Sequence, residues 1–396
     1  MLTTITTDIS YIGVDDPDMH LFESQYATPQ GMCYNSYLIT DERMAILDTT
    51  DSHTIEAWLA HLSEALAGRT PDYLVVHHLE PDHSSGIASA LALYPAMQIV
   101  CSAKAAQMLP LYIDGALLEG RVQTVKEGDT LPLGRHTLRF IGAAMVHWPE
   151  VMMSYDETDG VLFSADGFGK FGVYDADPDD WACEARRYYF NICGKYGSPV
   201  AAVLRKASAL PRLEAILPLH GPVLKGEAMA EAIRLYGIWS SYDVETEGIC
   251  IAHASIHGHT AEAASLLADM LRQRGCPKVA VADLCRDDMA EAVEDAFRYG
   301  TLVCMAASYD AGVFTPMHDF LHRLTIKAYQ HRRAALVENG SWAPSAAKTM
   351  RAMLDAMKDI EVVEPVVTLR GRITPESREQ LALLADVLTQ TPPQAS

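Results

Sequence analysis

The stretch HHLEPDHSSG, residues 77–86, carries the strongest signal for the fold and chemistry of the first part of the chain. It follows DYLVV, a continuous apolar run that predicts a strand buried on both faces. Side chains just past the carboxyl end of such a strand point into the crevice where ligands bind. His78 and Glu80 occupy alternate positions of an extended segment and so face the same side, and Asp82 and His83 follow at the turn into a helix. Taken alone, the stretch is consistent with a solvated loop, a zinc hydrolase site or a site for a harder metal.

Three further polar residues stand at the ends of later apolar runs. His147 ends AAMVH, Asp166 ends VLFSAD and His220 ends ILPLH, so we expect each to end a strand. A folded sheet could bring them together with the first four. One metal ion takes about four to six ligands, so this set suits a metal pair with one bridging carboxylate. Imidazole and carboxylate ligands suit iron and manganese, with zinc possible on ligand type alone. His77 should face the opposite side and be packed or hydrogen-bonded.

Length and composition limit the class of protein. A chain of 396 residues is long enough for two or three domains. The net charge of -21 argues against nonspecific binding to nucleic acid or to anionic lipid, which needs basic patches, and would suit a basic redox partner. No apolar run approaches the roughly 18–20 residues of a membrane span, and the N-terminus lacks the features of a signal peptide. The eight cysteines include no Cys-x-x-Cys pair, so we expect reduced thiols in a cytoplasmic protein.

The pattern along the chain predicts two α/β domains. Residues 1–245 alternate short apolar runs with turns and occasional helices, which is typical of a sheet sandwich flanked by helices. SSYDVETEG, residues 240–248, is expected to be a polar linker. Over residues 246–396, the apolar runs ICIAHA, VAVADL, TLVCMAA, AALVEN and IEVVEPV alternate with helical segments. This alternation predicts a doubly wound parallel sheet of flavodoxin size and order.

Three loops of the second domain predict a flavin site. SIHGHT, residues 255–260, joins a strand to a helix whose N-terminus and backbone amides can bind a phosphate, and it resembles the FMN phosphate loop of flavodoxins. SYDAG (308–312) and NGSW (339–342) follow later strands, and Trp342 could stack on the flavin ring. The resemblance to flavodoxins implies FMN contacts at Ser255, Ile256, His257, Gly258, His259, Thr260, Ser308, Tyr309, Asp310, Ala311, Gly312, Asn339, Gly340, Ser341 and Trp342.

The motif His-x-Glu-x-Asp-His at residues 78–83, with the later histidines and aspartate at these intervals, resembles the flavodiiron proteins. YNSYLI, HWPE, LFSADGFG, RRYYFNI and LHGP also look like stretches of that family, so the resemblance covers essentially the whole chain. It implies that the first domain is a metallo-β-lactamase-like αββα sandwich. Hydrolases of that fold carry His-x-His-x-Asp-His, whereas this chain has Glu80 as the second ligand, which favours redox iron over zinc.

The resemblance also implies roles for individual residues. One iron would be held by His78, Glu80, His147 and a bridging Asp166. The other would be held by Asp82, His83, His220 and the same Asp166. Tyr26 and Tyr196 resemble pocket residues that could donate protons or hydrogen bonds. His257, His259, Asp310 and Ala311 depart from the residues common in the flavin loops of the family.

The resemblance implies an oxidoreductase that reduces dioxygen to water or nitric oxide to nitrous oxide. FMN would feed electrons to the iron pair, and a separate donor, a rubredoxin-like protein or a reduced cofactor, would reduce FMN. A head-to-tail homodimer or dimer of dimers would bring the flavin of one subunit to the iron of the other. The alternatives are a zinc hydrolase carrying a flavodoxin domain and an electron carrier whose first domain is metal-free.

Overall fold

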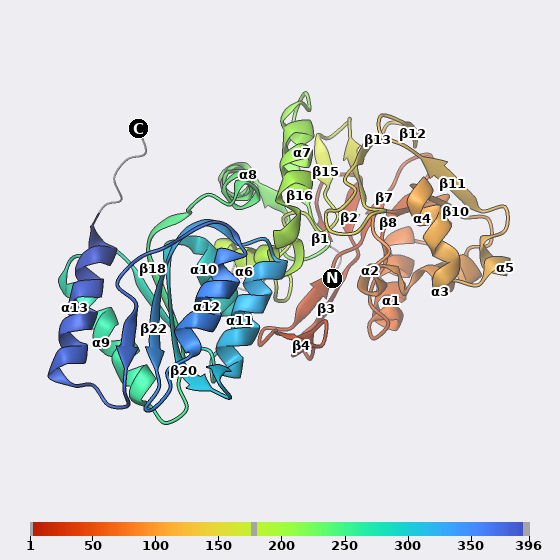
Figure 1. Cartoon of the computed structure of the whole chain (residues 1–396). Helices are drawn as coiled ribbons and strands as arrows, with labels where there is room; N and C mark the ends of the chain where they lie inside the picture. Colours follow the sequence, from red (N-terminus) through yellow and green to blue (C-terminus); the bar gives the residue numbers. More distant parts are fainter. Residues whose placement is uncertain (1–2, 176–179, 391–396) are drawn as a thin grey trace. The chain divides into compact units, whose positions relative to one another are not determined.

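The protein, in a computed structural model, is described over residues 3–175 and 180–390 (Figure 1). Contacts divide it into two compact units, Met1–Ser240 and Ser241–Ser396. Along the described ranges, every helix is too short or too polar to cross a lipid bilayer.

The first unit is built on two sheets. The larger has the order β1-β2-β7-β8-β9-β10-β11, and the second has the order β12-β13-β14-β15-β16-β17. The strands of the larger sheet are β1 (Thr3–Thr4), β2 (Ile9–Tyr11), β7 (Tyr37–Ile39), β8 (Ala45–Leu47), β9 (Tyr73–Val76), β10 (Gln98–Ser102) and β11 (Val122–Val125). Those of the second are β12 (Thr130–Pro132), β13 (Thr137–Gly142), β14 (Met152–Asp156), β15 (Val161–Phe163), β16 (Ala215–Leu217) and β17 (Leu224–Lys225). Two short ribbons pair β3 (Val14–Asp16) with β6 (Met32–Tyr34) and β4 (Leu21–Phe22) with β5 (Tyr26–Ala27).

Alternation along the strands explains the layers. In β9, Tyr73 and Val75 belong to the core between the two sheets, where they pack with residues such as Phe140 of β13. Leu74 and Val76 belong to a separate core on the outer face, shared with helical residues that include Trp58. A strand with apolar side chains on both faces is the feature that DYLVV predicts. The sheet is therefore covered by helices on one side and by the second sheet on the other.

The helices of the first unit lie between and after the strands. They are α1 (Ile55–Leu66), α2 (Pro81–Ser84), α3 (Ile87–Leu93), α4 (Ala103–Met108), α5 (Gly115–Leu118), α6 (Trp181–Tyr188), α7 (Gly197–Ser208) and α8 (Gly226–Ser241), with a π-helical turn at Tyr189–Cys193 and 3₁₀ turns at Leu109–Leu111 and Gly194–Tyr196. The predicted αββα sandwich is confirmed.

Two boundary predictions are wrong. The strand expected to end at His147 stops at Gly142, and His147 lies in the loop before β14, because AAMVHWPEV turns back to the paired strand instead of continuing the ladder. The linker expected over residues 240–248 is shorter, since α8 runs to Ser241 and β18 starts at Thr246.

The second unit is a parallel sheet with the strand order β19-β18-β20-β22-β23. Each main strand pairs in parallel with its neighbours, and helices connect them, which confirms the predicted doubly wound, flavodoxin-like order. The strands are β18 (Thr246–Ala254), β19 (Val279–Asp283), β20 (Tyr299–Tyr309), β22 (Gln330–Asn339) and β23 (Lys358–Val362), with β21 (Gly312–Val313) beside β20 and β24 (Val367–Leu369) beside β22. The helices are α9 (His259–Gln273), α10 (Met289–Arg298), α11 (Thr315–Ile326), α12 (Ala346–Asp355) and α13 (Pro375–Thr389).

His253 near the end of β18 gives the second unit a pH-dependent stability. The residue is 6% exposed, and its Nδ1 has no hydrogen-bond partner among the described residues. Burial lowers the pKa of His253, and the nearby carboxylates of Asp283 and Asp287 oppose this only in part. Because the unfolded ring titrates near its ordinary pKa of about 6.5, the unfolded chain binds more protons just below that pH. The free energy of unfolding should therefore rise with pH up to about 6.5, by at most about 1.4 kcal/mol per unit for this group.

Urea unfolding of wild type and of His253→Asn across this pH range measures the effect. The variant should lack this component, whereas replacement of the exposed His318 by asparagine should retain it. Equal pH slopes in wild type and His253→Asn would contradict the assignment.

Candidate functional site

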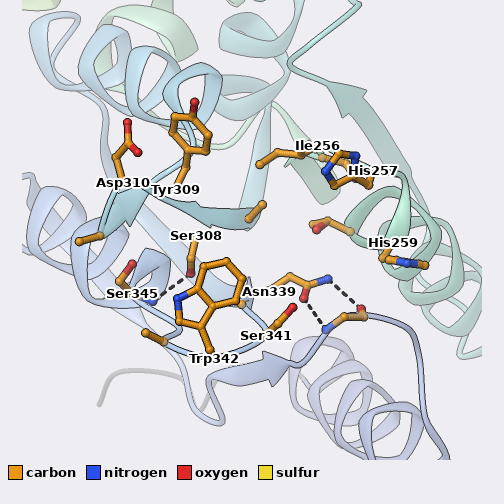
Figure 2. A pocket seen from close by; sticks show the side chains of 17 residues that line it. Ile256, His257, His259, Ser308, Tyr309, Asp310, Asn339, Ser341, Trp342 and Ser345 are labelled. Atoms are coloured by element: carbon orange, nitrogen blue, oxygen red, sulfur yellow. Dashed lines mark hydrogen bonds between the residues drawn. The ribbon is translucent and has the colours of Figure 1, made fainter.

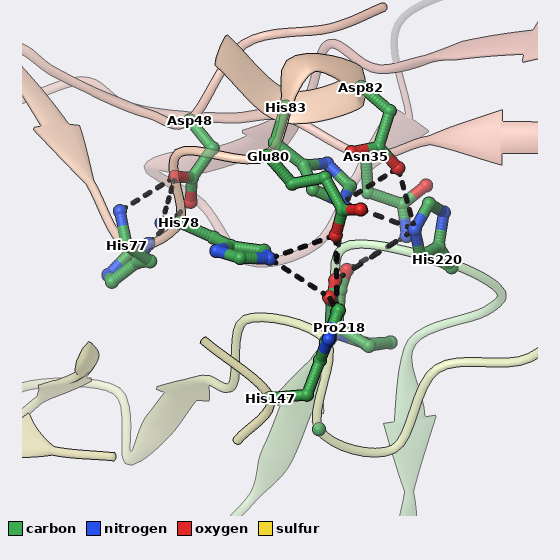
Figure 3. A network of polar contacts seen from close by, with 12 residues as sticks. Asn35, Asp48, His77, His78, Glu80, Asp82, His83, His147, Pro218 and His220 are labelled. Atoms are coloured by element: carbon green, nitrogen blue, oxygen red, sulfur yellow. Dashed lines mark hydrogen bonds and ion pairs between the residues drawn. The ribbon is translucent and has the colours of Figure 1, made fainter. Parts of the chain in front are cut away.

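A first group of possible metal ligands lies at one edge of the two sheets. It consists of His78, Glu80, His147 and Asp166, whose ligand atoms all lie within 4.8 Å of one another (Figure 3). His78 and Glu80 follow β9, His147 comes from the loop between β13 and β14, and Asp166 follows β15. The Nε2 atom of His147 lies 3.1 Å from Glu80 Oε2 and 3.1 Å from Asp166 Oδ2. Side chains from three separate segments of the chain therefore converge on one point.

A second group lies beside the first. Asp82 and His83 sit on α2, and His220 follows β16, with their ligand atoms again within 4.8 Å of one another. Asp82 Oδ2 is 3.3 Å from the Nε2 atoms of both His83 and His220. All three residues are buried.

Asp166 joins the two groups. Its Oδ2 lies 3.1 Å from His147 Nε2 and 3.4 Å from His78 Nε2, both in the first group. Its Oδ1 lies 3.2 Å from His83 Nε2 and 3.8 Å from His220 Nε2, both in the second. One carboxylate thus presents one oxygen to each group, which is the arrangement that a bridging ligand requires.

The histidines and carboxylates of the two groups shift one another's pKa values strongly even without a metal. Burial alone would raise the pKa of the Asp166 carboxyl, but the charge of His78 and the contacts with His147 and His83 outweigh it and hold that pKa well below its usual range. Burial favours the neutral His147 ring, yet its contacts with Asp166 and Glu80 raise the pKa of His147 to about 9. The histidines and carboxylates therefore neutralise one another, and a bound metal would take the place of the imidazole protons.

Orphaned oxygen atoms test whether the cluster suits metal ions. Among the described residues, both carboxylate oxygens of Asp82 and Oδ1 of Asp166 are buried and have no hydrogen-bond partner. Buried carboxylate oxygens normally accept hydrogen bonds or coordinate metals. The possible metal ligands are four imidazoles and three carboxylates, a set that fits a pair of iron ions. The residues present therefore fit the predicted metals.

The sequence did not predict the hydrogen-bond partners that the histidines of the two groups have outside these groups. His78 Nδ1 donates to Glu150 Oε1 at 2.8 Å, and His220 Nδ1 donates to the carbonyl oxygen of Cys33 at 2.7 Å. Glu150 is one acid in an acidic chain, and a backbone carbonyl leaves no sequence signal, so spacing could not reveal either. Tyr188 was also missed; its buried ring lies 5.5 Å from the His220 ring.

His77 is bonded away from the cluster. Its Nδ1 donates to Asp48 Oδ2 at 2.5 Å, and its Nε2 accepts from the Ser154 hydroxyl at 2.8 Å. All three side chains are buried. The expectation of an internally hydrogen-bonded His77 is confirmed.

The predicted tyrosines lie in different surroundings. The Tyr26 hydroxyl donates to the carbonyl oxygen of Asn191 at 3.0 Å, and its ring packs against Phe171. Tyr196 is half-buried at the end of a 3₁₀ turn, with the Lys195 ammonium 5.8 Å from its ring centre. A role for either in proton donation stays a prediction.

The flavin loops surround a cavity of about 470 Å³ in the second unit (Figure 2). Its lining includes every predicted FMN contact except Gly258 and Gly312, and it adds Ala307, Ala343, Ser345 and Gly371. Gly258 has a φ of 93° at the start of α9, a left-handed conformation that glycine adopts without strain. Gly312 belongs to β21, which pairs with the end of β20. Both glycines shape the loops without lining the cavity.

Some predicted contact residues are already engaged inside the protein. The Ser308 hydroxyl accepts from the backbone amides of Ser345 and Ala346, and the Asn339 side chain exchanges two hydrogen bonds with the backbone of Gly371. These side chains hold the loops around the cavity. Thr260, in contrast, is 2% exposed and lines the cavity. Trp342 is 90% exposed and so is not a core residue.

Comparisons with known proteins agree with this architecture. Residues 32–197 match the model of the ODP family beta lactamase. Diflavin flavoprotein A 1 of Synechocystis is 29% identical over 296 residues, covering 73% of this chain and 51% of that protein. The anaerobic nitric oxide reductase flavorubredoxin of Pectobacterium atrosepticum is 27% identical over 366 residues, covering 89% of this chain and 71% of that protein. The chain spans about half the length of the diflavin flavoproteins that it matches.

Solved structures match almost the whole chain. The flavodiiron protein of Giardia intestinalis superimposes with a TM-score of 0.91 at 23% identity, covering 98% of this chain and 96% of that one. Rubredoxin oxygen:oxidoreductase of Desulfovibrio gigas superimposes with a TM-score of 0.91 at 22% identity, covering 98% of each chain.

Fold and site together define a two-domain protein that joins a metallo-β-lactamase-like domain to a flavodoxin-like domain. The resemblance seen in the sequence is confirmed by these findings. Over almost its whole length the chain has the fold of flavodiiron proteins, and its relatives include diflavin flavoproteins and flavorubredoxins.

Proposed function

We propose that this chain is an oxidoreductase that reduces dioxygen to water, nitric oxide to nitrous oxide, or both, at an iron pair supplied with electrons by FMN. The observation that carries the proposal is Asp166, which directs one oxygen to each of two adjacent ligand groups. The names of a relative, a nitric oxide reductase, and of a structural neighbour, an oxygen oxidoreductase, support the same two gases.

The proposed ligands divide between two metal positions that share Asp166. We call the set His78, Glu80 and His147 with Asp166 the first position, and the set Asp82, His83 and His220 with Asp166 the second position. Bound iron would supply electrons and open coordination sites for the gas, and the flavin would supply two electrons more. Three carboxylates offset most of the charge of such a pair, so the buried site can hold it.

The residues around the second position limit the access of water. His220 is in edge or tilted contact with the rings of Phe22, Tyr34 and Tyr188. All three rings are buried, and the Tyr34 hydroxyl has no hydrogen-bond partner among the described residues. Aromatic rings that exclude water strengthen electrostatic interactions inside the site and limit side reactions with water. Tyr26 and Tyr196 remain our candidates for proton or hydrogen-bond donation.

The second unit would hold FMN in the cavity between the three loops. The N-terminus of α9, Ser255 and Thr260 would take the phosphate, and the loops at Tyr309–Asp310 and Ser341–Trp342 would enclose the ring. Because metal and flavin sites belong to separate units, we propose a head-to-tail homodimer or dimer of dimers as the working form. A separate rubredoxin-like protein or a reduced cofactor would deliver electrons in the cytoplasm.

A zinc hydrolase is the competing function, and Glu80 argues against it. This anionic oxygen ligand stands where hydrolases of the fold carry a histidine, and its Oε2 faces both His78 and His147. The added negative charge favours iron that changes oxidation state over zinc.

The test is gas consumption by anaerobically purified protein with iron and FMN quantified. After full reduction, dioxygen and nitric oxide are supplied separately with one electron donor. Faster dioxygen loss without peroxide would identify an oxygen reductase, and faster nitric oxide loss a nitric oxide reductase. A zinc-loaded protein that consumes neither gas would refute the proposal in favour of a hydrolase.

Trp342 provides a separate test of the flavin cavity. Its ring is almost fully exposed without flavin, so Trp342→Ala should change the free energy of unfolding of flavin-free protein by less than about 0.5 kcal/mol. If the ring stacks on bound FMN, the same change should weaken FMN binding by about 10-fold, and Trp342→Phe should restore most of the affinity. Fluorescence titration with FMN measures this, with the exposed Leu383→Ala as control. Unchanged FMN affinity in Trp342→Ala would exclude stacking.

A further inference from the structure

Two ligand histidines are supported from behind by chemically different groups. His78 and His220 both direct Nε2 toward the cluster. Behind His78, Nδ1 donates to the carboxylate of Glu150 at 2.8 Å. Behind His220, Nδ1 donates at 2.7 Å to a neutral backbone carbonyl, that of Cys33. The two hydrogen bonds are similar in length, but the acceptor behind His78 carries a negative charge and the acceptor behind His220 does not.

Glu150 is fixed in place by other bonds. Its Oε1 also accepts from the backbone amide of Leu79 at 3.0 Å, and its own carbonyl accepts from the Ser102 hydroxyl at 2.8 Å. The residue is 1% exposed, and Oε2 is buried with no hydrogen-bond partner among the described residues. These contacts tie the loop that carries His147 to the ends of β9 and β10.

Glu150 also lines a cavity of about 470 Å³, together with Lys104, Lys126 and Lys206. The Lys206 ammonium donates to Glu127 at 2.7 Å and to the carbonyl of Gly142 at 2.8 Å. The side chain that hydrogen-bonds to the Glu150 carboxylate is His78, at 2.8 Å.

The two metal positions consequently differ in charge. The first position has Glu80, a share of Asp166 and, behind His78, Glu150. The second has Asp82 and the same share of Asp166, with a neutral carbonyl behind His220. A carboxylate behind a ligand histidine fixes the ring tautomer and makes the ring a stronger donor to metal.

We propose that Glu150 is a positioning residue that makes the two metal positions unequal. It orients His78 so that Nε2 faces the metal, and its charge makes the first position bind iron more tightly and at a lower reduction potential than the second. The inference rests on the proposed iron pair and goes beyond it, because it assigns a role to a residue that is not a ligand and ranks the two positions.

The experiment measures each position alone. In an Asp82→Ala background the first position remains complete, and in a Glu80→Ala background the second remains. Anaerobic titration with ferrous iron gives the affinity in each background, with and without Glu150→Gln or Glu150→Leu. Glutamine keeps an acceptor for His78 Nδ1 without the charge, whereas leucine removes both.

We expect Glu150→Gln to weaken iron binding at the first position by about 10-fold and Glu150→Leu by up to about 100-fold. At the second position both changes should stay within about 2-fold, as for sites that do not interact. In the full protein, Glu150→Gln should also raise the reduction potential of the more easily oxidised iron, since a negative charge is lost while the hydrogen bond remains. A purely structural role for Glu150 would not move that potential in the glutamine variant.

Asp156→Asn is the matched control. Asp156 accepts from the ring of buried His136 at 3.1 Å and, with His136 and Asp159, forms a third group of possible ligands that is separate from the two proposed positions. It should alter iron affinity at neither position. Glutamine is nearly isosteric with glutamate, so Glu150→Gln carries the test if Glu150→Leu does not fold.

Equal losses at both positions, or no loss at the first, would overturn the inference. Wild type that binds iron and consumes gas while the Glu150 variants behave like wild type would refute this inference alone. Wild type without affinity for iron would refute the proposed function and this inference with it.

Discussion

Replacing Asp166 by asparagine is expected to weaken iron binding at both metal positions and to reduce gas consumption to background. The two oxygens of Asp166 face the two ligand groups, one at 3.1 Å from His147 and the other at 3.2 Å from His83. An amide keeps the size of the side chain but supplies one acceptor, and its nitrogen would be directed at a metal or an imidazole. The loss should exceed the roughly 10–100-fold that removal of an outer hydrogen-bond partner costs.

Iron per chain, flavin per chain and gas consumption should be measured together. Flavin content should stay at the wild-type value, because the flavin cavity lies wholly in the other unit. Asp156→Asn, which also removes a buried carboxylate from the first unit, should keep iron and activity. An Asp166→Asn protein that retained the full iron complement would show that Asp166 does not bridge.

Replacing Glu80 by histidine should convert an iron site into one that prefers zinc. The change recreates the His-x-His pattern of the hydrolases and removes one negative charge from the first position. Supplied with equal iron and zinc, the variant should lose iron in favour of zinc, and gas consumption should fall by at least about 100-fold, beyond the range for an outer partner.

Metal analysis after growth or refolding with both metals gives the readout. Glu80→Gln separates charge from ligand type, since it loses the charge without gaining an imidazole. It should lose iron and gain little zinc. If Glu80→His remained an iron protein with undiminished gas consumption, Glu80 would not be the residue that selects the metal.

Much of the fold could be predicted from the chain because its signals are local. A strand buried on both faces needs an unbroken apolar run, and Tyr73–Val76 is such a run. The second unit repeats strand and helix so regularly that its sheet order follows from general rules of parallel connections. The loop containing His147 was misjudged because AAMV is as apolar as a strand, while only pairing with β14 shows where the ladder ends at Gly142.

The candidate site was predictable where its residues follow strands. His78, Glu80 and Asp166 carry that signal, and the structure places them together. Hydrogen-bond partners of the ligands that have no periodic or positional signal in the sequence were not predicted. Glu150 ends the HWPE stretch and reaches His78 across 72 positions, and the stretch itself does not show which side chain this acid bonds. In the flavin loops, position alone indicated Ser308 and Asn339, but it could not show that their side chains bond within the protein.

The buried chain from Asp48 through His77 to Ser154 has the connectivity of a serine hydrolase triad. Carboxylate, imidazole and hydroxyl are joined at 2.5 and 2.8 Å in the order that such enzymes use to activate a nucleophile. Here the Ser154 side chain is wholly buried, and the Phe163 ring is stacked alongside His77 at 6.3 Å. A substrate cannot reach the hydroxyl, so these hydrogen bonds instead hold together β14 and the segments that follow β8 and β9. In a domain with a metallo-β-lactamase-like fold, a geometric search for acyl-transfer sites would select this trio, and solvent access alone rejects it.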